Sequence, residues 1–159
     1  RPVDGMAELY RHWQAQGAAF HYVSGSPWQL AQPLADFIDR WEFPGGSLRL
    51  RHFRLKDRNA LSFISKPDEL KQTVIREKLL MYPHRDFVLV GDSGERDPEM
   101  YAQIALDFPG RIRHIAIRNV TDEDANSSRY RRTFEMLPSD LWTVFDNPDT
   151  LHGLVTEKT

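Results

Sequence analysis

The sequence lacks cysteine altogether over its 159 residues. This absence excludes a disulfide scaffold, a zinc site built from thiolates and a cysteine nucleophile. The sequence also lacks any run of 18 apolar residues, so it predicts no membrane-spanning helix. Its first ten residues contain no apolar core of the kind that a signal peptide has, and we expect no such peptide there.

An excess of positive charge is missing too. The formal net charge is −2, whereas dedicated nucleic-acid binders are usually basic, so we predict that nucleic acid is not a partner. Only five of the 21 basic residues are lysine. The preference for arginine fits phosphate recognition, and it also fits a bias in genome base composition.

The residues that are present suit a globular protein. Hydrophobic residues make up 40% and charged residues 28%, which is the ordinary range for a soluble domain. A chain of this length buries roughly 70% of its unfolded surface, so it needs no disulfide or metal to hold it together. We expect a single domain over residues 1–159, with residues 122–159 as a less regular C-terminal extension.

Periodicity predicts alternating helices and strands. Helical spacing, with starting signals at Asp4, Pro27 and Asp97, predicts helices at residues 4–16, 27–41, 67–81 and 97–107. Apolar or alternating runs predict strands at residues 19–23, 48–55, 86–90 and 112–120. Two short helices are expected in the tail, at residues 140–145 and 148–154. The alternation favours parallel pairing, so we predict an α/β fold: a three-layer α/β/α sandwich around a parallel, Rossmann-like sheet.

Ligands bind to open α/β sheets at the carboxyl ends of the strands, and two polar clusters lie at such ends. The first cluster is Ser24, Gly25 and Ser26, directly after the strand predicted to end at Val23. Its hydroxyls and turn amides, followed by a helix, would form an anion cradle. A plain helix-capping turn explains the same residues, and the cluster alone does not separate the two interpretations.

The second cluster, residues 91–97, contains two acids. Asp92 and Asp97 are separated by a glycine-containing turn that would bring both carboxylates to one point. Mg²⁺ prefers hard oxygen ligands and usually takes one or two carboxylates, with water and substrate phosphate completing its shell. Asp97 would also serve as a helix N-cap, and the two roles are compatible for different oxygens. Asp92, an acid at the end of a hydrophobic strand, has no such structural explanation.

Other catalytic motifs are absent or do not fit. Residues 91–94, Gly-Asp-Ser-Gly, match the surroundings of a trypsin-like serine, but that fold consists of two β-barrels, and neither serine cluster spells Gly-x-Ser-x-Gly. The six histidines include no His-x-x-x-His pair, which disfavours a zinc site, and no glycine-rich nucleotide loop occurs. Lys71 lies near the start of its helix, where the helix dipole disfavours a positive charge. It is either a solvated lysine or a charge that a ligand requires.

Four segments carry a resemblance to a known family. They are residues 20–30 (FHYVSGSPWQL), 43–46 (FPGG), 91–101 (GDSGERDPEMY) and 111–120 (RIRHIAIRNV). On these segments the chain resembles the haloacid dehalogenase superfamily of phosphotransferases. More narrowly, it is similar to the catalytic domain of the actin-patch-associated phosphatidate phosphatases and their bacterial relatives, to which the lipin phosphatases are more distantly related. The resemblance covers about residues 3–121.

The resemblance implies roles for individual residues around the substrate. Ser24 corresponds to the hydroxyl that holds the substrate phosphate, with Gly25 and Ser26 beside it. Lys71 corresponds to the lysine that neutralises the phosphate and the nucleophile, so Ser24 and Lys71 are the implied catalytic residues on this chain.

The resemblance also implies a cofactor and a reaction. Asp92 and Asp97 correspond to the acids that hold Mg²⁺ in this superfamily. In such enzymes an aspartate attacks phosphorus to form an aspartyl-phosphate, and water then releases the phosphate. The metal and the lysine offset the charge of the transferring group.

One motif of the family has no counterpart in the sequence. The motif Asp-x-Asp-x-Thr/Val supplies the nucleophile and the general acid, and it should precede residue 1. Asp4 has no acid two residues further on, and residues 122–124 have the spacing but follow the last predicted strand. The strand of that motif is central to the family's sheet, so its absence would leave a gap of roughly 9–10 Å between the flanking strands. We expect the nucleophile to lie on a longer protein, outside these residues.

The prediction is therefore a Mg²⁺-dependent phosphatase acting on phosphatidate or another phosphomonoester. One alternative is a non-catalytic module that binds a phospholipid or phosphoanion on the same scaffold, and another is a pure interaction module. Trp28, Trp41 and Phe43 beside Arg40 would form an apolar edge for contact with a membrane surface, although core packing also explains Trp28. We expect a cytoplasmic or peripheral membrane location.

Overall fold

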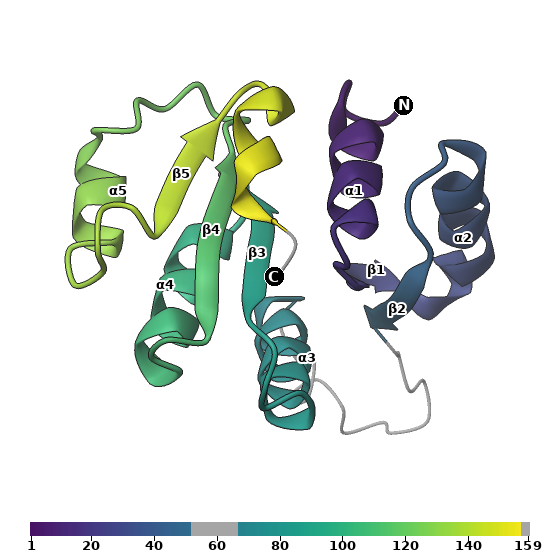
Figure 1. The fold of residues 1–159 in the computed structure, drawn as a ribbon, viewed down its shortest axis with the longest axis horizontal. Helices are drawn as coiled ribbons and strands as arrows, with labels where there is room; N and C mark the ends of the chain where they lie inside the picture. Colours follow the sequence, from purple (N-terminus) through teal and green to yellow (C-terminus); the bar gives the residue numbers. More distant parts are fainter. Residues whose placement is uncertain (52–66, 157–159) are drawn as a thin grey trace, which may run out of the picture. The chain divides into compact units, whose positions relative to one another are not determined.

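The computed structural model describes residues 1–51 and 67–156 (Figure 1). Helices and parallel strands make up the described chain, which confirms the predicted α/β class. The strands form two separate small sheets, so the three-layer sandwich stays a prediction. The chain divides into an N-terminal unit, residues 1–75 with the chain end from Val155, and a C-terminal unit, residues 76–154. Each unit is described by itself.

The N-terminal unit consists of helices around a two-stranded parallel sheet. Its elements are α1 (Met6–Ala15), β1 (Phe20–Pro27), the 3₁₀ turn η1 (Trp28–Leu30), α2 (Ala31–Arg40), β2 (Gly46–Arg51) and the first part of α3 (Pro67–Met81). The pairing of β1 with β2 runs from Phe20 opposite Gly46 to Val23 opposite Arg49. A Cβ atom at Gly46 would lie 2.3 Å from the backbone oxygen of Phe20, so this register requires glycine there.

Aromatic rings fill the interior of the N-terminal unit. Helix α1 buries Leu9 and Trp13, because its apolar residues recur at helical spacing. The Tyr10 ring lies 5.0 Å from the ring of Phe20 and 5.8 Å from that of Phe43. Helix α2 has no buried residue in this structure. The core of this unit is therefore built on α1 and the sheet.

Two helix starts in this unit differ from the prediction. Helix α1 has Gly5, with φ of 81°, as its N-cap instead of Asp4. The helix expected over residues 27–41, in which Pro33 predicted a kink or a split, is divided into η1 and α2 ahead of that proline. Pro33 falls in the first turn of α2, where its missing N–H leaves no helical bond unmade. The strand expected over 48–55 is observed from Gly46 to Arg51, and its later part lies outside the described residues.

The C-terminal unit has a three-stranded parallel sheet. Its elements after α3 are β3 (Phe87–Asp92), α4 (Asp97–Asp107), β4 (Ile112–Arg118), α5 (Ser128–Thr133), β5 (Trp142–Phe145) and the 3₁₀ segment η3 (Pro148–Leu154). The strand order is β3-β4-β5. Parallel strands need a crossover connection, and α4 supplies it between β3 and β4 while packing against both.

Aliphatic residues from α4 and β4 form the core of the C-terminal unit. Ile104, Ile115 and Ile117 have no exposed surface. Beside them the rings of Phe134 and Trp142 stack at 4.4 Å. Such burial is typical of a central parallel strand, although β4 also carries Arg113 and His114.

The tail is more regular than the sequence suggested. The helix expected over residues 140–145 is wrong, because Trp142–Phe145 forms β5 and pairs with β4. Aromatic and β-branched residues favour a strand once a neighbouring edge is available. Helix α5 was not predicted at all, whereas the short helix expected over residues 148–154 is present as η3.

Candidate functional site

The predicted site residues fall into two groups, one in each unit. Ser24, Gly25 and Ser26 lie at the end of β1, and Lys71 lies in α3, all in the N-terminal unit. Asp92 and Asp97 lie at the end of β3 and the start of α4, in the C-terminal unit. The structure therefore brings the two acids together and the two serines together.

The serine group belongs to β1 itself, which corrects the predicted strand end at Val23. The strand continues to Pro27, and its register with β2 is irregular between Val23 and Pro27. Within this irregular stretch the Ser24 hydroxyl donates to Ser26 Oγ at 3.0 Å and accepts from the Ser26 amide at 3.2 Å. No side chain caps η1 or α2. The helix-capping interpretation of these serines is therefore wrong, while the anion cradle stays a prediction.

Lys71 lies one turn into α3. Helix α3 begins at Pro67, and the acids of its first turn are Asp68 and Glu69. Acids there suit the positive end of the helix dipole. The Lys71 side chain is half-buried. It is thus neither a fully solvated lysine nor a core residue, and its role toward phosphate stays a prediction.

The acidic group is joined by hydrogen bonds to the backbone. Asp92 is the last residue of β3, and its Oδ1 accepts from the Gly94 amide at 2.9 Å. Asp97 Oδ2 accepts from the Asp92 amide at 3.2 Å. Asp97 is only 2% exposed. The two carboxylates therefore hold the same short turn, residues 92–97, which we call the acidic turn.

The position of Asp97 corrects its predicted role as helix N-cap. Helix α4 starts at Asp97, and the N-cap position is Arg96. The Asp97 carboxylate points back to the strand end, where a Cβ atom at Gly91 would lie 2.4 Å from Asp97 Oδ2. Glycine at position 91 therefore leaves the space that lets this carboxylate lie against β3.

The acidic turn fits a magnesium site in its donor chemistry. Two carboxylates belong to one turn, and Mg²⁺ commonly takes one or two carboxylates together with water and substrate phosphate. Within residues 1–51 and 67–156, no group of three or more His, Cys, Asp or Glu side chains is arranged to hold a metal. A complete cage made of protein side chains is therefore not present in the described chain, and the pair would leave coordination positions for substrate.

Two residues near the acidic turn were missed from sequence. Ser93, 2% exposed, accepts at Oγ from the amides of Val120 at 2.9 Å and Thr121 at 3.2 Å. Arg129 donates to the backbone oxygen of Ser93 at 2.8 Å. Both contacts join residues about 30 positions apart, so no short pattern in the sequence predicts them. The arginine-rich stretch at residues 129–132 was the one available signal.

Helix α4 also carries an ionised acid beside this turn. Glu99 forms an ion pair with Arg129, Nε to Oε1 at 2.8 Å. Burial raises the pKa of the Glu99 carboxyl, but the hydrogen bond and charge of Arg129 outweigh it and hold this pKa below its usual range. Glu99 is therefore ionised at neutral pH and already paired.

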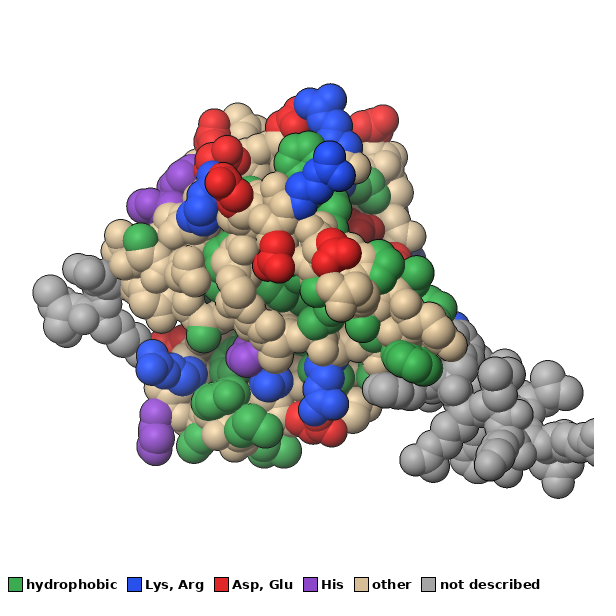
Figure 2. Space-filling model, turned by 90° about the vertical axis from the view of Figure 1, so that its right-hand side faces the viewer, with side chains coloured by type: hydrophobic (Ala, Val, Ile, Leu, Met, Phe, Trp, Pro, Cys, Tyr) green, Lys and Arg blue, Asp and Glu red, His purple; other side chains and the backbone are tan. Residues whose placement is uncertain are grey.

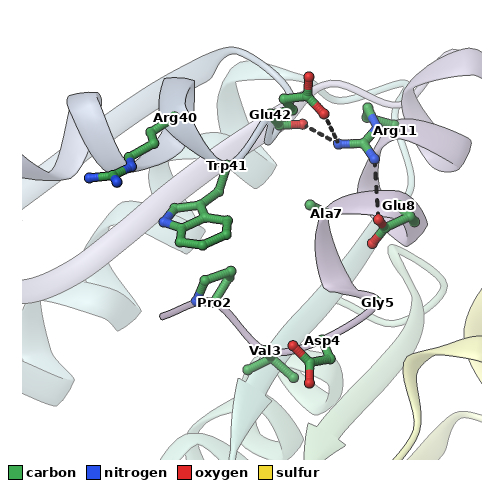
Figure 3. Close-up of a pocket in the computed structure, with 10 residues that line it drawn as sticks. All are labelled: Pro2, Val3, Asp4, Gly5, Ala7, Glu8, Arg11, Arg40, Trp41 and Glu42. Carbon is green, nitrogen blue, oxygen red and sulfur yellow. Dashed lines mark hydrogen bonds and ion pairs between the residues drawn. The ribbon is translucent and has the colours of Figure 1, made fainter.

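A pocket of about 370 Å³ lies elsewhere in the N-terminal unit, between the start of α1 and the end of α2 (Figure 3). None of the predicted site residues lines it. Arg11 reaches Glu8 on one side and Glu42 on the other, each at 3.5 Å, and turns away from Trp41. The Arg11 guanidinium is therefore already engaged by acidic side chains of the protein.

The predicted apolar edge is exposed in part. Trp28 is 48% exposed and Trp41 40%, so core packing of Trp28 is wrong. Phe43 instead stacks with Phe37 at 6.0 Å. On the face drawn in Figure 2, hydrophobic side chains come to the surface in several groups, with acidic and basic ones between them. No helix within the described ranges is both long and apolar enough to cross a membrane.

Comparison with known proteins gives a consistent picture. Residues 1–119 match the family model of the phosphatidate phosphatase APP1 catalytic domain. The chain is 39% identical over 118 residues to phosphatidate phosphatase APP1 of Saccharomyces cerevisiae, which is 73% of this chain and 19% of that protein. It is 34% identical over 123 residues to an uncharacterized protein of Schizosaccharomyces pombe, 76% of this chain and 20% of that protein.

The chain spans about a fifth of the length of these two relatives. The matched region includes both polar groups described above, the serines of β1 and the acidic turn. It ends before α5, β5 and η3. No solved structure matches the chain.

Proposed function

The chain belongs to the family of the phosphatidate phosphatase APP1 catalytic domain, and on that premise we propose that it contributes the phosphate-binding and magnesium-binding parts of a phosphatidate phosphatase. The observation that carries this proposal is the acidic turn. The carboxylates of Asp92 and Asp97 both accept hydrogen bonds from backbone amides of this turn, at the carboxyl end of a parallel strand. That edge is where α/β sheets bind their ligands.

The proposed roles follow the chemistry of each side chain. The Ser24 hydroxyl, supported by Ser26 and the Gly25 backbone, donates a hydrogen bond to a phosphate oxygen. The Lys71 ammonium offsets the negative charge of the phosphate. Asp92 and Asp97 would hold Mg²⁺. When bound, the ion supplies charge neutralisation and orientation for the transferring phosphoryl group.

The proposed reaction is that of the haloacid dehalogenase superfamily. A carboxylate oxygen of an aspartate forms a bond to phosphorus, and the bond from phosphorus to the substrate oxygen breaks. The leaving alcohol, diacylglycerol where the substrate is phosphatidate, takes a proton from a general acid. Water then attacks phosphorus, the aspartyl bond breaks and phosphate leaves. No Asp-x-Asp-x-Thr/Val motif occurs in the 159 residues, so we place the nucleophile on a part of the protein outside them.

The absence of this motif from the 159 residues also supports a second candidate function. A protein without any such motif would bind a phospholipid or phosphoanion through Ser24 and Lys71 without turnover. The two candidates differ in one measurable product, free phosphate. Peripheral contact with a membrane, through Trp28 and Trp41, and a location in the cytoplasm or at a membrane surface belong to both candidates as proposals.

The test uses full-length protein and vesicles that contain phosphatidate. We expect phosphate release that stops when EDTA removes Mg²⁺, returns when Mg²⁺ is restored, and falls at least about 100-fold in Asp92→Asn. Asp86→Asn is the matched control. It makes the same chemical change at a residue that directly precedes β3, at the opposite end of that strand from Asp92.

Each other result has a stated meaning. Full activity in Asp92→Asn would contradict the proposal that Asp92 holds Mg²⁺. Vesicle binding without phosphate release would establish the binding module in place of the enzyme. Equal release from phosphatidate and from a water-soluble phosphomonoester would contradict the lipid substrate while leaving the phosphatase in place.

A further inference from the structure

Arg129, a residue of α5 more than 30 positions further along the chain, holds the backbone of the acidic turn. Its Nη1 donates to the backbone oxygen of Ser93 at 2.8 Å, and its Nη2 donates to that of Glu95 at 3.0 Å. Both oxygens belong to the stretch between Asp92 and Asp97. The spacing of these two acids along the turn therefore depends on a side chain of α5.

The same guanidinium group fixes the start of α4. Its Nε lies 2.8 Å from Glu99 Oε1 and its Nη2 lies 3.2 Å from Glu99 Oε2, a two-point ion pair. Glu99 follows Asp97 by two residues in the first turn of α4. One planar cation thus contacts the middle of the acidic turn and the helix that continues it, which a lysine cannot do because its ammonium lacks the planar fork.

A second connection joins the turn to the loop after β4. The buried Ser93 hydroxyl accepts from the Val120 and Thr121 amides and lies 2.9 Å from Thr121 Oγ1. Glu123 adds an oxygen at 3.5 Å from Arg129 Nη1. Residues 120–129 therefore contact the acidic turn at its side chains and at its backbone.

Arg129 is itself unsuited to bind substrate phosphate. Its Nε, Nη1 and Nη2 all donate to protein oxygens, and its side chain is 26% exposed. Two acids, Glu99 and Glu123, lie against it. Its charge is balanced within the protein, which leaves geometry as its contribution.

We infer that Arg129 is a positioning residue for the proposed magnesium site, and that the chain beyond the family match completes this site. Mg²⁺ requires near-ideal octahedral geometry, so its affinity depends on how firmly Asp92 and Asp97 are held. This inference rests on the proposed function for the metal, while the hold of Arg129 on the turn rests on the contacts above.

The sign of one measurement separates positioning from plain electrostatics. Removal of a positive charge near a cation site would tighten Mg²⁺ binding if charge alone mattered. Loss of a positioning contact weakens binding instead, by about 10- to 100-fold for outer partners of metal ligands. Arg129→Met should therefore raise the Mg²⁺ concentration for half-maximal phosphate release by about tenfold or more.

The experiment compares four variants of the full-length protein. Arg129→Met removes charge and fork, Arg129→Lys keeps the charge, and Glu99→Gln keeps the shape of the partner. Arg131→Met is the matched control, because Arg131 is an exposed arginine on the same helix. We expect Arg129→Lys and Glu99→Gln to raise the Mg²⁺ concentration for half-maximal phosphate release by a smaller factor than Arg129→Met does. In Arg131→Met this concentration should stay within about twofold of that of the unchanged protein.

A second readout needs neither metal nor activity. In metal-free protein, the backbone amides of residues 93–97 should exchange with deuterium faster in Arg129→Met, while the amides of β1 keep their rate. At saturating Mg²⁺ the variant should regain most of its maximal rate, with an unchanged KM for phosphatidate. A merely structural role would lower the maximal rate at every Mg²⁺ concentration.

Three results would overturn the inference. They are an unchanged or lower Mg²⁺ requirement in Arg129→Met, an equal effect in Arg131→Met, and unchanged exchange at residues 93–97 in a folded variant. Phosphate release without Mg²⁺ in the unchanged protein would contradict the proposed function instead. In that case the exchange rates alone decide whether Arg129 holds the turn.

Discussion

The two units hold their polar groups in different ways. In the N-terminal unit, Ser24 and Ser26 bond to each other within one irregular stretch of β1. In the C-terminal unit, the acidic turn is bonded to α5 and to the loop after β4, residues about 30 positions away. Long-range contacts fix a turn more firmly than bonds between neighbours in the sequence, because they must all break together. The comparison indicates that the acidic turn is held by contacts with distant residues, whereas the side-chain bonds described for Ser24 and Ser26 join near neighbours.

Burial follows the same division. Strand β1 has no fully buried residue and α2 has none either, whereas most of β4 and α4 is buried. Because burial of apolar surface is the main stabilising contribution, we expect the C-terminal unit to be the more stable of the two. Four predictions are ordered from the largest effect to the smallest, and three of them compare the two units directly.

The largest effect is expected from shortening one isoleucine in a helix of each unit. Ile104→Ala in α4 removes a side chain with no exposure and should lower the free energy of unfolding by about 2–5 kcal/mol. Ile38→Ala in α2 removes a half-buried one and should cost about 1 kcal/mol. Urea unfolding followed by tryptophan fluorescence measures both. Equal costs would contradict the proposed difference between the units.

The next prediction adds one methyl group at a tight glycine in each unit. A Cβ at Gly91 would lie 2.4 Å from Asp97 Oδ2, and one at Gly46 would lie 2.3 Å from the Phe20 oxygen. Each alanine substitution should destabilise the protein by about 1–3 kcal/mol. Only Gly91→Ala should also weaken Mg²⁺ binding, measured by titration calorimetry. A Cβ at Gly45 would meet nothing within 4 Å, so Gly45→Ala serves as the control.

The third prediction concerns pH and His114 in β4. Burial lowers the pKa of the His114 imidazole, against a smaller opposing influence of Asp140. Its Nε2 lies 2.9 Å from Thr143 Oγ1. Below about pH 6.5 the unfolded chain binds a proton that the folded unit disfavours. Stability should therefore fall as pH drops from about 6.5 through the lowered folded pKa, by at most about 1.4 kcal/mol per pH unit.

Comparison with His114→Gln isolates this effect, because the carboxylates titrate alike in both proteins. The unfolding free energies are measured between pH 8 and pH 5. The stability advantage of the unchanged protein should shrink steadily as the pH falls. An advantage that stays constant or grows would show that burial does not disfavour the charged imidazole.

The smallest effect is expected from the exposed arginine of the N-terminal unit. Arg11 pairs with Glu8 and Glu42 at 3.5 Å, and its side chain is 39% exposed. Such pairs contribute about 0–1 kcal/mol, so Arg11→Met should shift the urea midpoint only slightly. Arg129→Met, which removes a more buried arginine with two backbone acceptors, should shift it more. A larger shift of the urea midpoint in Arg11→Met than in Arg129→Met would contradict the proposed difference between the units.

Local patterns predicted most elements of both units. Helix α3 was expected over residues 67–81 and α4 over 97–107, and both are observed there. In each, a proline in the first turn and apolar residues at helical spacing decide the helix through short-range sterics and burial. Strand β3 followed likewise from an apolar run and β4 from a run of mixed apolar and basic residues, and the observed carboxyl end of each strand differs from the predicted end by two residues.

The failures arose where a distant partner decides the conformation. Residues 142–145 become a strand only because β4 offers an edge to pair with. The Asp97 side chain would cap a helix in isolation, but it binds the Asp92 amide across the space left by Gly91. Ser24 to Ser26 lie in β1 between two residues that pair with β2, Val23 opposite Arg49 and Pro27 opposite Arg51. None of these partners is visible in a short window of sequence.

By itself the sequence determined the α/β class, the family, which acids and hydroxyls are candidates for phosphate chemistry, and that Asp92 and Asp97 share one short turn, because these depend on residue type and local spacing. Only the tertiary structure decided that Arg129 and Ser93 hold this turn. The reason is physical: hydrogen bonds and ion pairs across 30 or more residues form only after the sheet has brought their elements together.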